Sequence, residues 1–204
     1  MKMIRITFAL LMALACALPA MASAEEGPRT VIEGTVNNII HVLEARTDKK
    51  VISPEDREAI RHAIEGRFDY EAMASRSLGK PWKDLDAGER TRFTGIFRDL
   101  LEYSYGNRLS DYKGQKVEFD DAEIKGENAR VKSKVIDGTR ETPVEYRLHQ
   151  TETGWQVYDI RIEGTSMVRT FYQDFQSQLD TGSYTDLVKS LETKIADLKA
   201  KAKG

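Results

Sequence analysis

Residues 144–175 read VEYRLHQTETGWQVYDIRIEGTSMVRTFYQDF, and this stretch decides the fold. Apolar and polar side chains alternate over residues 144–149, the period-two pattern of a strand with one buried and one solvent-facing side. Residues 153–154, Thr-Gly, supply turn chemistry before a second run at 155–162 that carries apolar residues on both faces. The stretch therefore predicts two adjacent strands, the second covered on both sides.

A helix is expected directly after the second strand. Gly164 ends that strand, and the Ser166 side chain can cap the first turn of a helix. Apolar residues then recur at helical spacing, namely at Met167, Val168, Phe171 and Phe175. The opening stretch is thus a strand, a turn, a second strand and a helix over residues 166–179.

Outward from this stretch, the N-terminal half has the pattern of helices. Apolar residues at a spacing of three and four predict amphipathic helices over residues 29–45, 68–79 and 87–109. Ser53 followed by Pro54 is a strong start for a further helix, because serine caps and proline is preorganised for the first turn.

From Gln115 the period changes to two. Alternating residues around Val117 and Val131 predict two strands before the opening stretch, so four consecutive strands are expected in one antiparallel sheet. A last helix is expected over residues 183–200. Helices, then strands, then helices indicate an α+β fold, with a four-stranded antiparallel sheet at 112–164 and C-terminal helices at 165–204.

The first 24 residues have the pattern of a secretory signal. Lys2 and Arg5 form a positive start, and residues 8–21 are an apolar stretch followed by small residues. A membrane anchor is the alternative, but the stretch is shorter than the about 20 apolar residues that span a bilayer. We predict export and cleavage after Ala24, which leaves residues 25–204 as a single domain.

Cys16 is the only cysteine, and it lies inside the predicted signal. The exported chain would therefore have no disulfide, no thiol nucleophile and no thiolate metal ligand. Lipidation of Cys16 is an alternative, since residues 13–16 loosely resemble a lipobox. The chain has 31 basic and 33 acidic residues. This balance argues against nucleic acid as a partner, because binding a polyanion requires a clustered basic surface.

The three histidines, His41, His62 and His149, do not have metal-ligand spacing. The first two lie on separate predicted helices and the third on the polar side of a strand. The sequence contains no glycine-rich phosphate loop, nucleophile elbow or kinase motif. We therefore expect no metal and no cofactor.

Asp69, Asp159 and Glu163 are candidate general acids or bases, because an apolar setting raises the pKa of a carboxyl group. Asp159 is the strongest candidate, since its strand is otherwise largely apolar. We favour a structural carboxylate bonded to a neighbouring arginine or backbone amide, because it lacks partners at a known catalytic spacing. The enzymatic alternative would pair one of the aspartates with Tyr146 or Tyr158 to transfer a proton to or from a small apolar substrate.

A set of residues spread over most of the chain forms a distinctive pattern. The set comprises Phe68, Asp69, Tyr70, Met73, Leu78, Gly79, Trp82, Arg90, Phe93, Phe97, Leu100, Leu101, Tyr105, Val144, Tyr146, Trp155, Val157, Tyr158, Asp159, Glu163, Gly164 and Ser166. The pattern resembles the MlaC family, the toluene-tolerance auxiliary component of a periplasmic ABC transport system. The resemblance covers about residues 29–192.

The resemblance implies a soluble periplasmic carrier of phospholipids without catalytic residues or metal. In the family the acyl tails lie in an apolar pocket between sheet and helices, and the head group stays outside. The resemblance also implies two membrane partners, an inner-membrane MlaD-like ring protein of an ABC transporter and an outer-membrane MlaA-like lipoprotein complex. We expect a monomer that supports outer-membrane lipid asymmetry. A hopanoid or sterol-like cargo is the alternative.

The predicted pocket residues are large apolar side chains beside the sheet. They are Leu78, Trp82, Phe93, Phe97, Leu101, Tyr105, Val135, Tyr146, Leu148, Trp155, Val157, Val168, Phe171 and Phe175. One departure from the family follows Ser166, where relatives often have asparagine-tyrosine-arginine and this chain has a different sequence. Arg169 and Tyr172 are therefore the candidates for contact with a head group or a partner.

Overall fold

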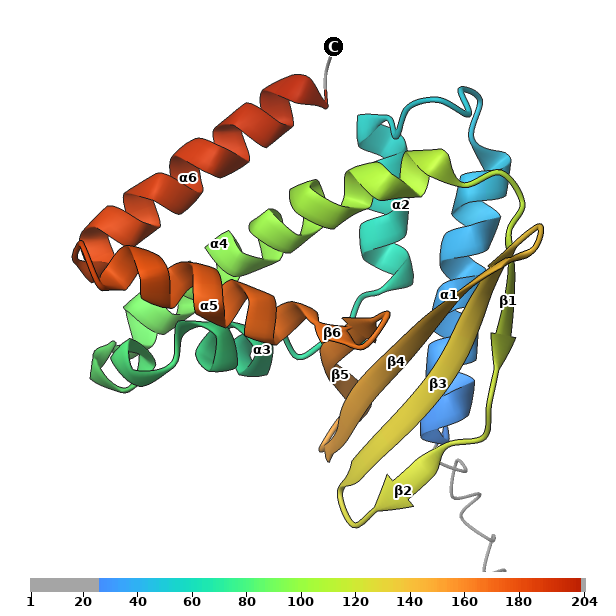
Figure 1. Ribbon diagram of the computed structural model, residues 1–204, viewed down its shortest axis with the longest axis horizontal. Helices are drawn as coiled ribbons and strands as arrows, with labels where there is room; N and C mark the ends of the chain where they lie inside the picture. Colours follow the sequence, from blue (N-terminus) through green and yellow to red (C-terminus); the bar gives the residue numbers. More distant parts are fainter. Residues whose placement is uncertain (1–25, 203–204) are drawn as a thin grey trace, which may run out of the picture.

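The computed structural model describes residues 26–202, and the predicted signal at residues 1–24 lies outside them. Helices lie beside one antiparallel sheet (Figure 1), which confirms the α+β class. Before the sheet come α1 (Pro28–Ala45), α2 (Pro54–Ala63), α3 (Tyr70–Leu78), the 3-10 helix η1 (Lys80–Asp84), α4 (Ala87–Tyr105) and the 3-10 helix η2 (Gly106–Asp111). After the sheet come α5 (Met167–Leu179) and α6 (Tyr184–Lys201).

The helices begin where local sequence signals place them. The Ser53 hydroxyl accepts a hydrogen bond from the Asp56 amide, and the Asp56 carboxylate accepts one from the Ser53 amide. The predicted cap of α5 is confirmed, because the Ser166 hydroxyl accepts from the Arg169 amide at 3.0 Å. The predicted helix over 87–109 differs in its last turn, since α4 ends at Tyr105 and continues as η2.

The sheet has six strands among the described residues, rather than the predicted four. They are β1 (Lys116–Phe119), β2 (Glu123–Lys125), β3 (Asn128–Asp137), β4 (Arg140–Thr151), β5 (Gly154–Ile162) and β6 (Thr165–Ser166). Their order is β1-β3-β4-β5-β6, with β2 paired to the start of β3 and every pair antiparallel. The additional strands β2 and β6 are too short to show a period of two.

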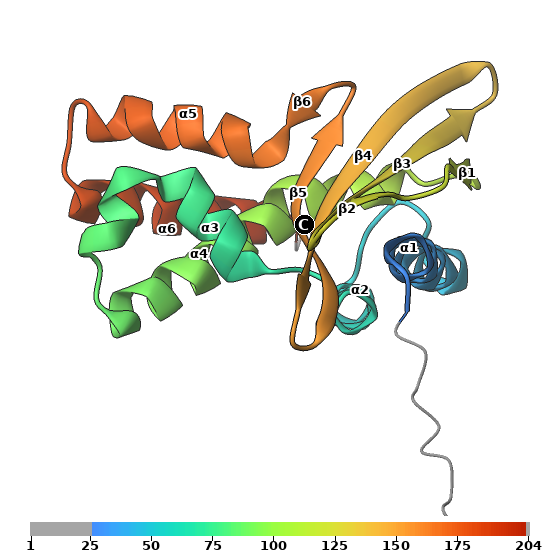
Figure 2. The same cartoon turned by 90° about the horizontal axis from the view of Figure 1, so that it is seen from below.

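One face of the sheet is apolar. Val131, Tyr146 and Ile160 are direct neighbours across β3, β4 and β5, so their side chains share a face. Val31 and Ile32 of α1 are buried in the same cluster as Val131, and Figure 2 shows α1 on one side of the sheet. This layer of α1 on the sheet is the first hydrophobic core.

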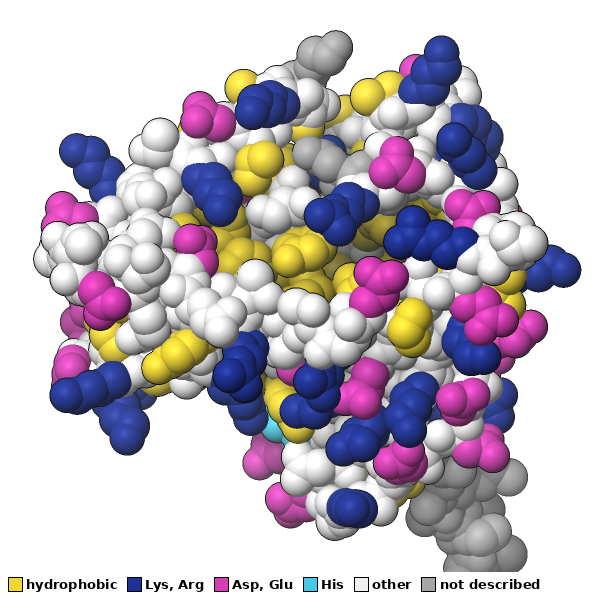
Figure 3. All heavy atoms as spheres, viewed as in Figure 1, with side chains coloured by type: hydrophobic (Ala, Val, Ile, Leu, Met, Phe, Trp, Pro, Cys, Tyr) yellow, Lys and Arg dark blue, Asp and Glu magenta, His cyan; other side chains and the backbone are white. Residues whose placement is uncertain are grey.

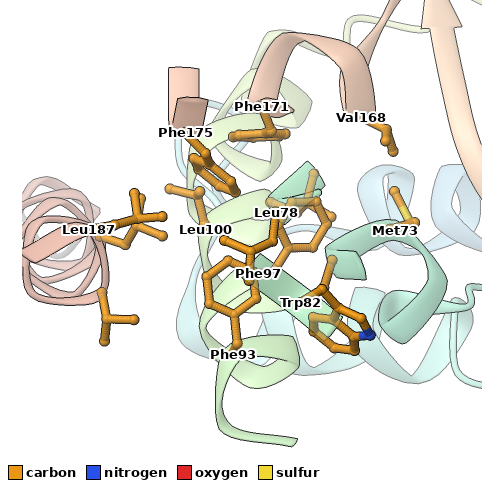
Figure 4. Packing of buried hydrophobic residues seen from close by; sticks show 14 of the residues in the cluster. Met73, Leu78, Trp82, Phe93, Phe97, Leu100, Val168, Phe171, Phe175 and Leu187 are labelled. Atoms are coloured by element: carbon orange, nitrogen blue, oxygen red, sulfur yellow. The ribbon is translucent and has the colours of Figure 1, made fainter. Parts of the chain in front are cut away.

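A second core lies among the C-terminal helices, α3 and α4. Phe93 and Phe97 of α4 face Phe171 and Phe175 of α5, as Figure 4 shows. The Phe97 and Phe171 ring centroids are 5.3 Å apart and meet edge to face, the geometry that aromatic quadrupoles favour. Leu187 of α6 closes the cluster from the side.

The two cores give the molecule two halves. In Figure 2 the helices α3 to α6 gather beyond β5 and β6, whereas α1 stays with the sheet. Where the halves meet, Phe68 forms a parallel bridge with Val157 of β5, and the Asp69 amide donates to the Val157 carbonyl. Within residues 26–202, none of the helices has the length and apolar character needed to cross a membrane.

Candidate functional site: two joined apolar cavities

The first cavity lies between α2, α4 and the end of β5. Its volume is about 230 Å³. Its wall is mainly apolar and consists of Ile39, Ile52, Ile60, Ile64, Phe68, Met73, Leu101, Tyr105, Leu109, Ile160 and Met167. The cavity also touches Arg57, Arg61, Tyr70, Arg98 and Glu102. An apolar wall with a few polar groups is typical of a site for a small lipophilic molecule.

The second cavity lies between α1, η2 and the apolar face of the sheet. Its volume is about 500 Å³. Apolar residues from all three elements line it, namely Val36, Ile39, Ile40, Leu43, Leu109, Val117, Val135 and Tyr146. Polar residues also line it, namely Arg108, Asp111, Tyr112, Gln115, Asp137, Arg140 and Thr142.

Ile39 and Leu109 line both cavities, so the two adjoin at these side chains. Figure 3 shows a hollow with hydrophobic side chains at its floor, in the region where α4 runs between α5 and α2 in Figure 1. Lys, Arg, Asp and Glu side chains rim this hollow. The arrangement is one branched apolar site that opens toward a polar surface.

Charged side chains beside the first cavity form hydrogen-bonded ion pairs with one another. Arg61 donates to both carboxylate oxygens of Glu102, at 3.1 and 2.8 Å, and to Glu58 at 2.8 Å. The hydrogen bond to Glu102 raises the pKa of Arg61 further above its usual value. Burial raises the pKa of the neighbouring Tyr70 phenol to about 12, so Tyr70 is a neutral hydrogen-bond donor at physiological pH.

The second cavity has a similar rim. Arg140 lies 3.6 Å from Glu163, and the Gln115 amide donates to Asp137 at 3.4 Å. Burial raises the pKa of Tyr146 above its usual value, so this phenol is also neutral. Both compartments therefore combine apolar walls with a neutral phenol and a few charged side chains.

Only part of the predicted pocket set lines these cavities. Leu101 and Tyr105 line the first, and Val135 and Tyr146 line the second. The remaining side chains lie in the packed helical core (Leu78, Trp82, Phe93, Phe97, Val168, Phe171 and Phe175) or in the core between α1 and the sheet (Leu148, Trp155 and Val157). The predicted set is thus divided between the walls of the two cavities and the two packed cores.

Sequence reasoning missed the contribution of α1, α2 and η2. Ile39, Ile60 and Leu109 line the cavities although none was a pocket candidate. The signal was present as the apolar stripes of the first two helices, but a stripe does not reveal whether it faces a packed core or a hollow.

The head-group candidates of the sequence lie elsewhere. Arg169 and Tyr172 are on α5, and neither lines the two cavities. Arg169 is exposed, and Tyr172 is 41% exposed with its ring close to Gly79. These two side chains belong to the outer surface of the helical half.

The carboxylates that were considered for acid–base chemistry have structural contacts. Asp159 is buried and accepts from the Ser166 hydroxyl and the Val168 amide, so it has the backbone-amide partner that the favoured interpretation expects. Asp69 caps α3 by accepting from the Ala72 amide, and its other oxygen lies 2.9 Å from His149 Nε2. Neither aspartate lines the two cavities.

Residues 26–202 contain no group of three or more histidine, cysteine or carboxylate side chains that could hold a metal ion. Other hollows of the described residues are lined largely by charged side chains, as at Glu123, Lys125, Arg130 and Arg147. The joined cavities are thus the candidate site.

Comparison with known proteins identifies chains that are similar to this one. The family model described as MlaC protein matches residues 33–193. A solved structure from Ralstonia solanacearum, described as a phospholipid-binding protein in complex with a phospholipid, superposes with a TM-score of 0.78 at 20% identity. The match covers 85% of this chain and 99% of that one, so the fold is shared.

Two curated relatives also match over most of their length. The intermembrane phospholipid transport system binding protein MlaC of Haemophilus influenzae is 22% identical over 84% of this chain and 83% of its own. The toluene tolerance protein ttg2D of Pseudomonas putida is 25% identical over 89% of this chain and 86% of its own.

Proposed function

Because the chain belongs to the MlaC family, we propose that it is a periplasmic phospholipid carrier that holds the acyl tails of one lipid in the two joined cavities. The observation that supports this function is that the two apolar cavities adjoin at Ile39 and Leu109 and together form a branched site. A ligand with two flexible chains matches a branched cavity better than a rigid hopanoid or sterol-like skeleton does.

The energetics of the cargo require such an enclosure. Each methylene kept from water is worth ~0.8 kcal/mol. Exposing two acyl tails with about 30 methylenes in total to water would therefore cost roughly 24 kcal/mol. A phospholipid that crossed an aqueous gap alone would have to overcome this free energy. A carrier lowers this barrier by replacing water with apolar walls. Since the membrane that the lipid leaves and the pocket that it enters are both apolar, one methylene more or less changes the free energy of this exchange little.

The size of the site is suitable for a lipid. The cavities of about 230 and 500 Å³ together fall within the range of roughly 300–1,000 Å³ that ligand sites occupy. The relatives are described by phospholipid binding, phospholipid transport and toluene tolerance, which supports the same cargo here. The phospholipid would be cargo and not a cofactor.

The route of the lipid is the finer part of the proposal. The chain would exchange single phospholipids with an inner-membrane MlaD-like ring protein of an ABC transporter and with an outer-membrane MlaA-like lipoprotein complex. This assignment rests on family membership and on the transport system in the description of one relative. A carrier requires no catalytic residue, and the structural contacts of Asp159 are consistent with that.

Lipid retention tests the proposal. Protein purified without detergent should carry phospholipid, which native mass spectrometry and solvent extraction would identify. Folded protein that is consistently empty and takes up no lipid from vesicles would contradict it. A recovered hopanoid would keep the carrier and change the cargo.

A variant at the junction of the cavities sharpens this test. Ile39→Trp places a larger side chain where both cavities adjoin, and we expect bound lipid to fall roughly tenfold, since overpacking costs about 1–3 kcal/mol. Ile124→Trp is the matched control, because Ile124 is 56% exposed on β2 and lines neither cavity. Equal lipid content in the two folded variants would show that the tails lie elsewhere.

A further inference from the structure

The 3-10 helix η2 (Gly106–Asp111) occupies the junction of the two cavities. Tyr105 and Gly106 line the first cavity, Arg108 lines the second, and Leu109 lines both. The regular helix α4 ends at Tyr105, and Gly106 is its C-cap. A polar side chain on η2 is therefore close to both apolar compartments.

Arg108 is the cation that η2 itself places at this junction. Its guanidinium carbon lies 5.6 Å from the centroid of the Tyr105 ring, which joins an arginine of the second cavity to a wall residue of the first. In the part of the chain that the structure describes, Arg108 has no carboxylate ion pair, whereas Arg61 is held by Glu102 and Arg140 by Glu163. The Arg108 charge is exposed and uncompensated by direct pairing.

We propose that the Arg108 guanidinium binds the phosphate of a diacyl phospholipid whose tails enter the two cavities on either side of Leu109. The proposal deepens the lipid-carrier function and rests on it. The phosphate of such a lipid sits where its two chains diverge, so it must lie near the place where the two cavities adjoin. Guanidinium groups match phosphate oxygens with two parallel hydrogen bonds. The Tyr105 ring contacts the arginine through its π face, which leaves the N–H donors of Arg108 for a ligand.

Asp111 modulates this site. Side chains three residues apart are eclipsed in a 3-10 helix, so Asp111 lies on the same side of η2 as Arg108, and both line the second cavity. Its negative charge opposes a phosphate at this rim. Neutralising Asp111 should therefore act in the direction opposite to neutralising Arg108.

The test compares two lipids with identical tails. Lipid-stripped protein is incubated with vesicles of dioleoylphosphatidylcholine that contain equal amounts of dioleoylphosphatidylglycerol and dioleoylglycerol, and the captured lipids are quantified by mass spectrometry. The wild-type protein should favour the phospholipid over dioleoylglycerol. In Arg108→Gln this ratio should fall on the order of fivefold, the effect of one charge-assisted hydrogen bond at a partly solvated site. Asp111→Asn should raise the ratio.

Arg90→Gln is the matched control. Arg90 lies 5.7 Å from the Trp82 ring, a stacking contact like that of Arg108, but it lines neither cavity. Its lipid ratio should equal that of the wild type. Circular dichroism would verify that each variant is folded, and the exposed position of Arg108 makes its substitution mild for folding.

The outcomes separate the two levels of the proposal. Wild-type protein that captures neither lipid would overturn the carrier function itself. Wild-type protein that captures both lipids equally, or an Arg108→Gln ratio equal to that of the wild type, would overturn the phosphate site and leave the carrier function intact. A loss of preference in Arg169→Gln instead of Arg108→Gln would assign the head group to α5 and likewise overturn the site on η2.

Discussion

At the scale of single residues, Asp159 shows how a buried charge is used for structure. Its side chain is 5% exposed, and it accepts hydrogen bonds from the Ser166 hydroxyl at 2.9 and 2.7 Å and from the Val168 amide at 3.2 Å. These donors belong to the N-cap and the first turn of α5, where the helix dipole also favours a negative charge. One carboxylate thereby fixes the start of α5 against β5.

We predict that Asp159→Ala lowers the free energy of unfolding by about 3 kcal/mol, because it leaves buried donors without an acceptor. Urea denaturation followed by circular dichroism would measure the change. Asp174→Ala, on the helix α5 that Asp159 caps, is the control. Asp174 is exposed and lies 3.9 Å from Lys194, so its loss should cost less than about 0.5 kcal/mol. Equal effects of both substitutions would contradict the capping role of Asp159.

At the scale of elements, the contact between α3 and α5 depends on Gly79. This residue ends α3 with φ of +72° and ψ of −131°, a conformation that side chains with a Cβ rarely adopt. A Cβ at this position would lie 2.7 Å from a carbon of the Tyr172 ring. In the same contact Gln176 donates to the Leu78 carbonyl at 3.1 Å. The close approach of the two helices thus requires a glycine.

We predict that Gly79→Ala destabilises the protein by about 2 kcal/mol, since it combines backbone strain with a steric clash. Gly95→Ala within α4 is the matched control, because its added Cβ meets no atom within 4 Å. Alanine is the better helix former, so this control should be neutral or stabilising by up to about 1 kcal/mol. Thermal denaturation of both variants would measure the difference.

A second comparison separates strain from clash at Gly79. In a Tyr172→Ala background the ring is absent, so Gly79→Ala should cost less than in the wild-type protein but should still cost the backbone strain. If the changes in unfolding free energy of the two substitutions were strictly additive, the Tyr172 ring would contribute no clash in the Gly79→Ala variant.

At the scale of the whole molecule, two packed cores flank a branched site that proteins ordinarily do not leave empty. The helical core and the core between α1 and the sheet are each filled with side chains, whereas apolar walls at their junction enclose about 230 and 500 Å³. Protein interiors are normally packed to the density of organic crystals. A bound lipid would complete this packing, so ligand and stability should be coupled.

We predict that stripping the lipid lowers the midpoint of thermal unfolding by roughly 10 °C. A ligand at about 1,000 times its dissociation constant stabilises the native state by about 4 kcal/mol. In a domain of this size 1 kcal/mol corresponds to roughly 2–4 °C. Calorimetry of lipid-stripped and reloaded protein would measure the shift, with Ile39→Trp as a variant whose midpoint should respond little. A midpoint that is independent of lipid in the wild-type protein would contradict the coupling.

The sequence alone determined the order and type of most elements. The alternation at residues 144–149 and the helical spacing after Ser166 are set by neighbouring residues, so they are readable without the fold. The caps at Ser53 and Ser166 are equally local. The short strands β2 and β6 were not predicted, because two or three residues carry no period and pair only when a longer strand is present.

Only the tertiary structure decided which apolar residues face a hollow. Phe97 and Ile39 both lie on apolar stripes of helices, yet Phe97 is packed among the rings of α5 while Ile39 lines both cavities. The hydrophobic effect removes both side chains from water and does not specify what replaces the water. Whether that replacement is another side chain or a ligand depends on how far apart the elements are held, and this spacing is a property of the assembled fold.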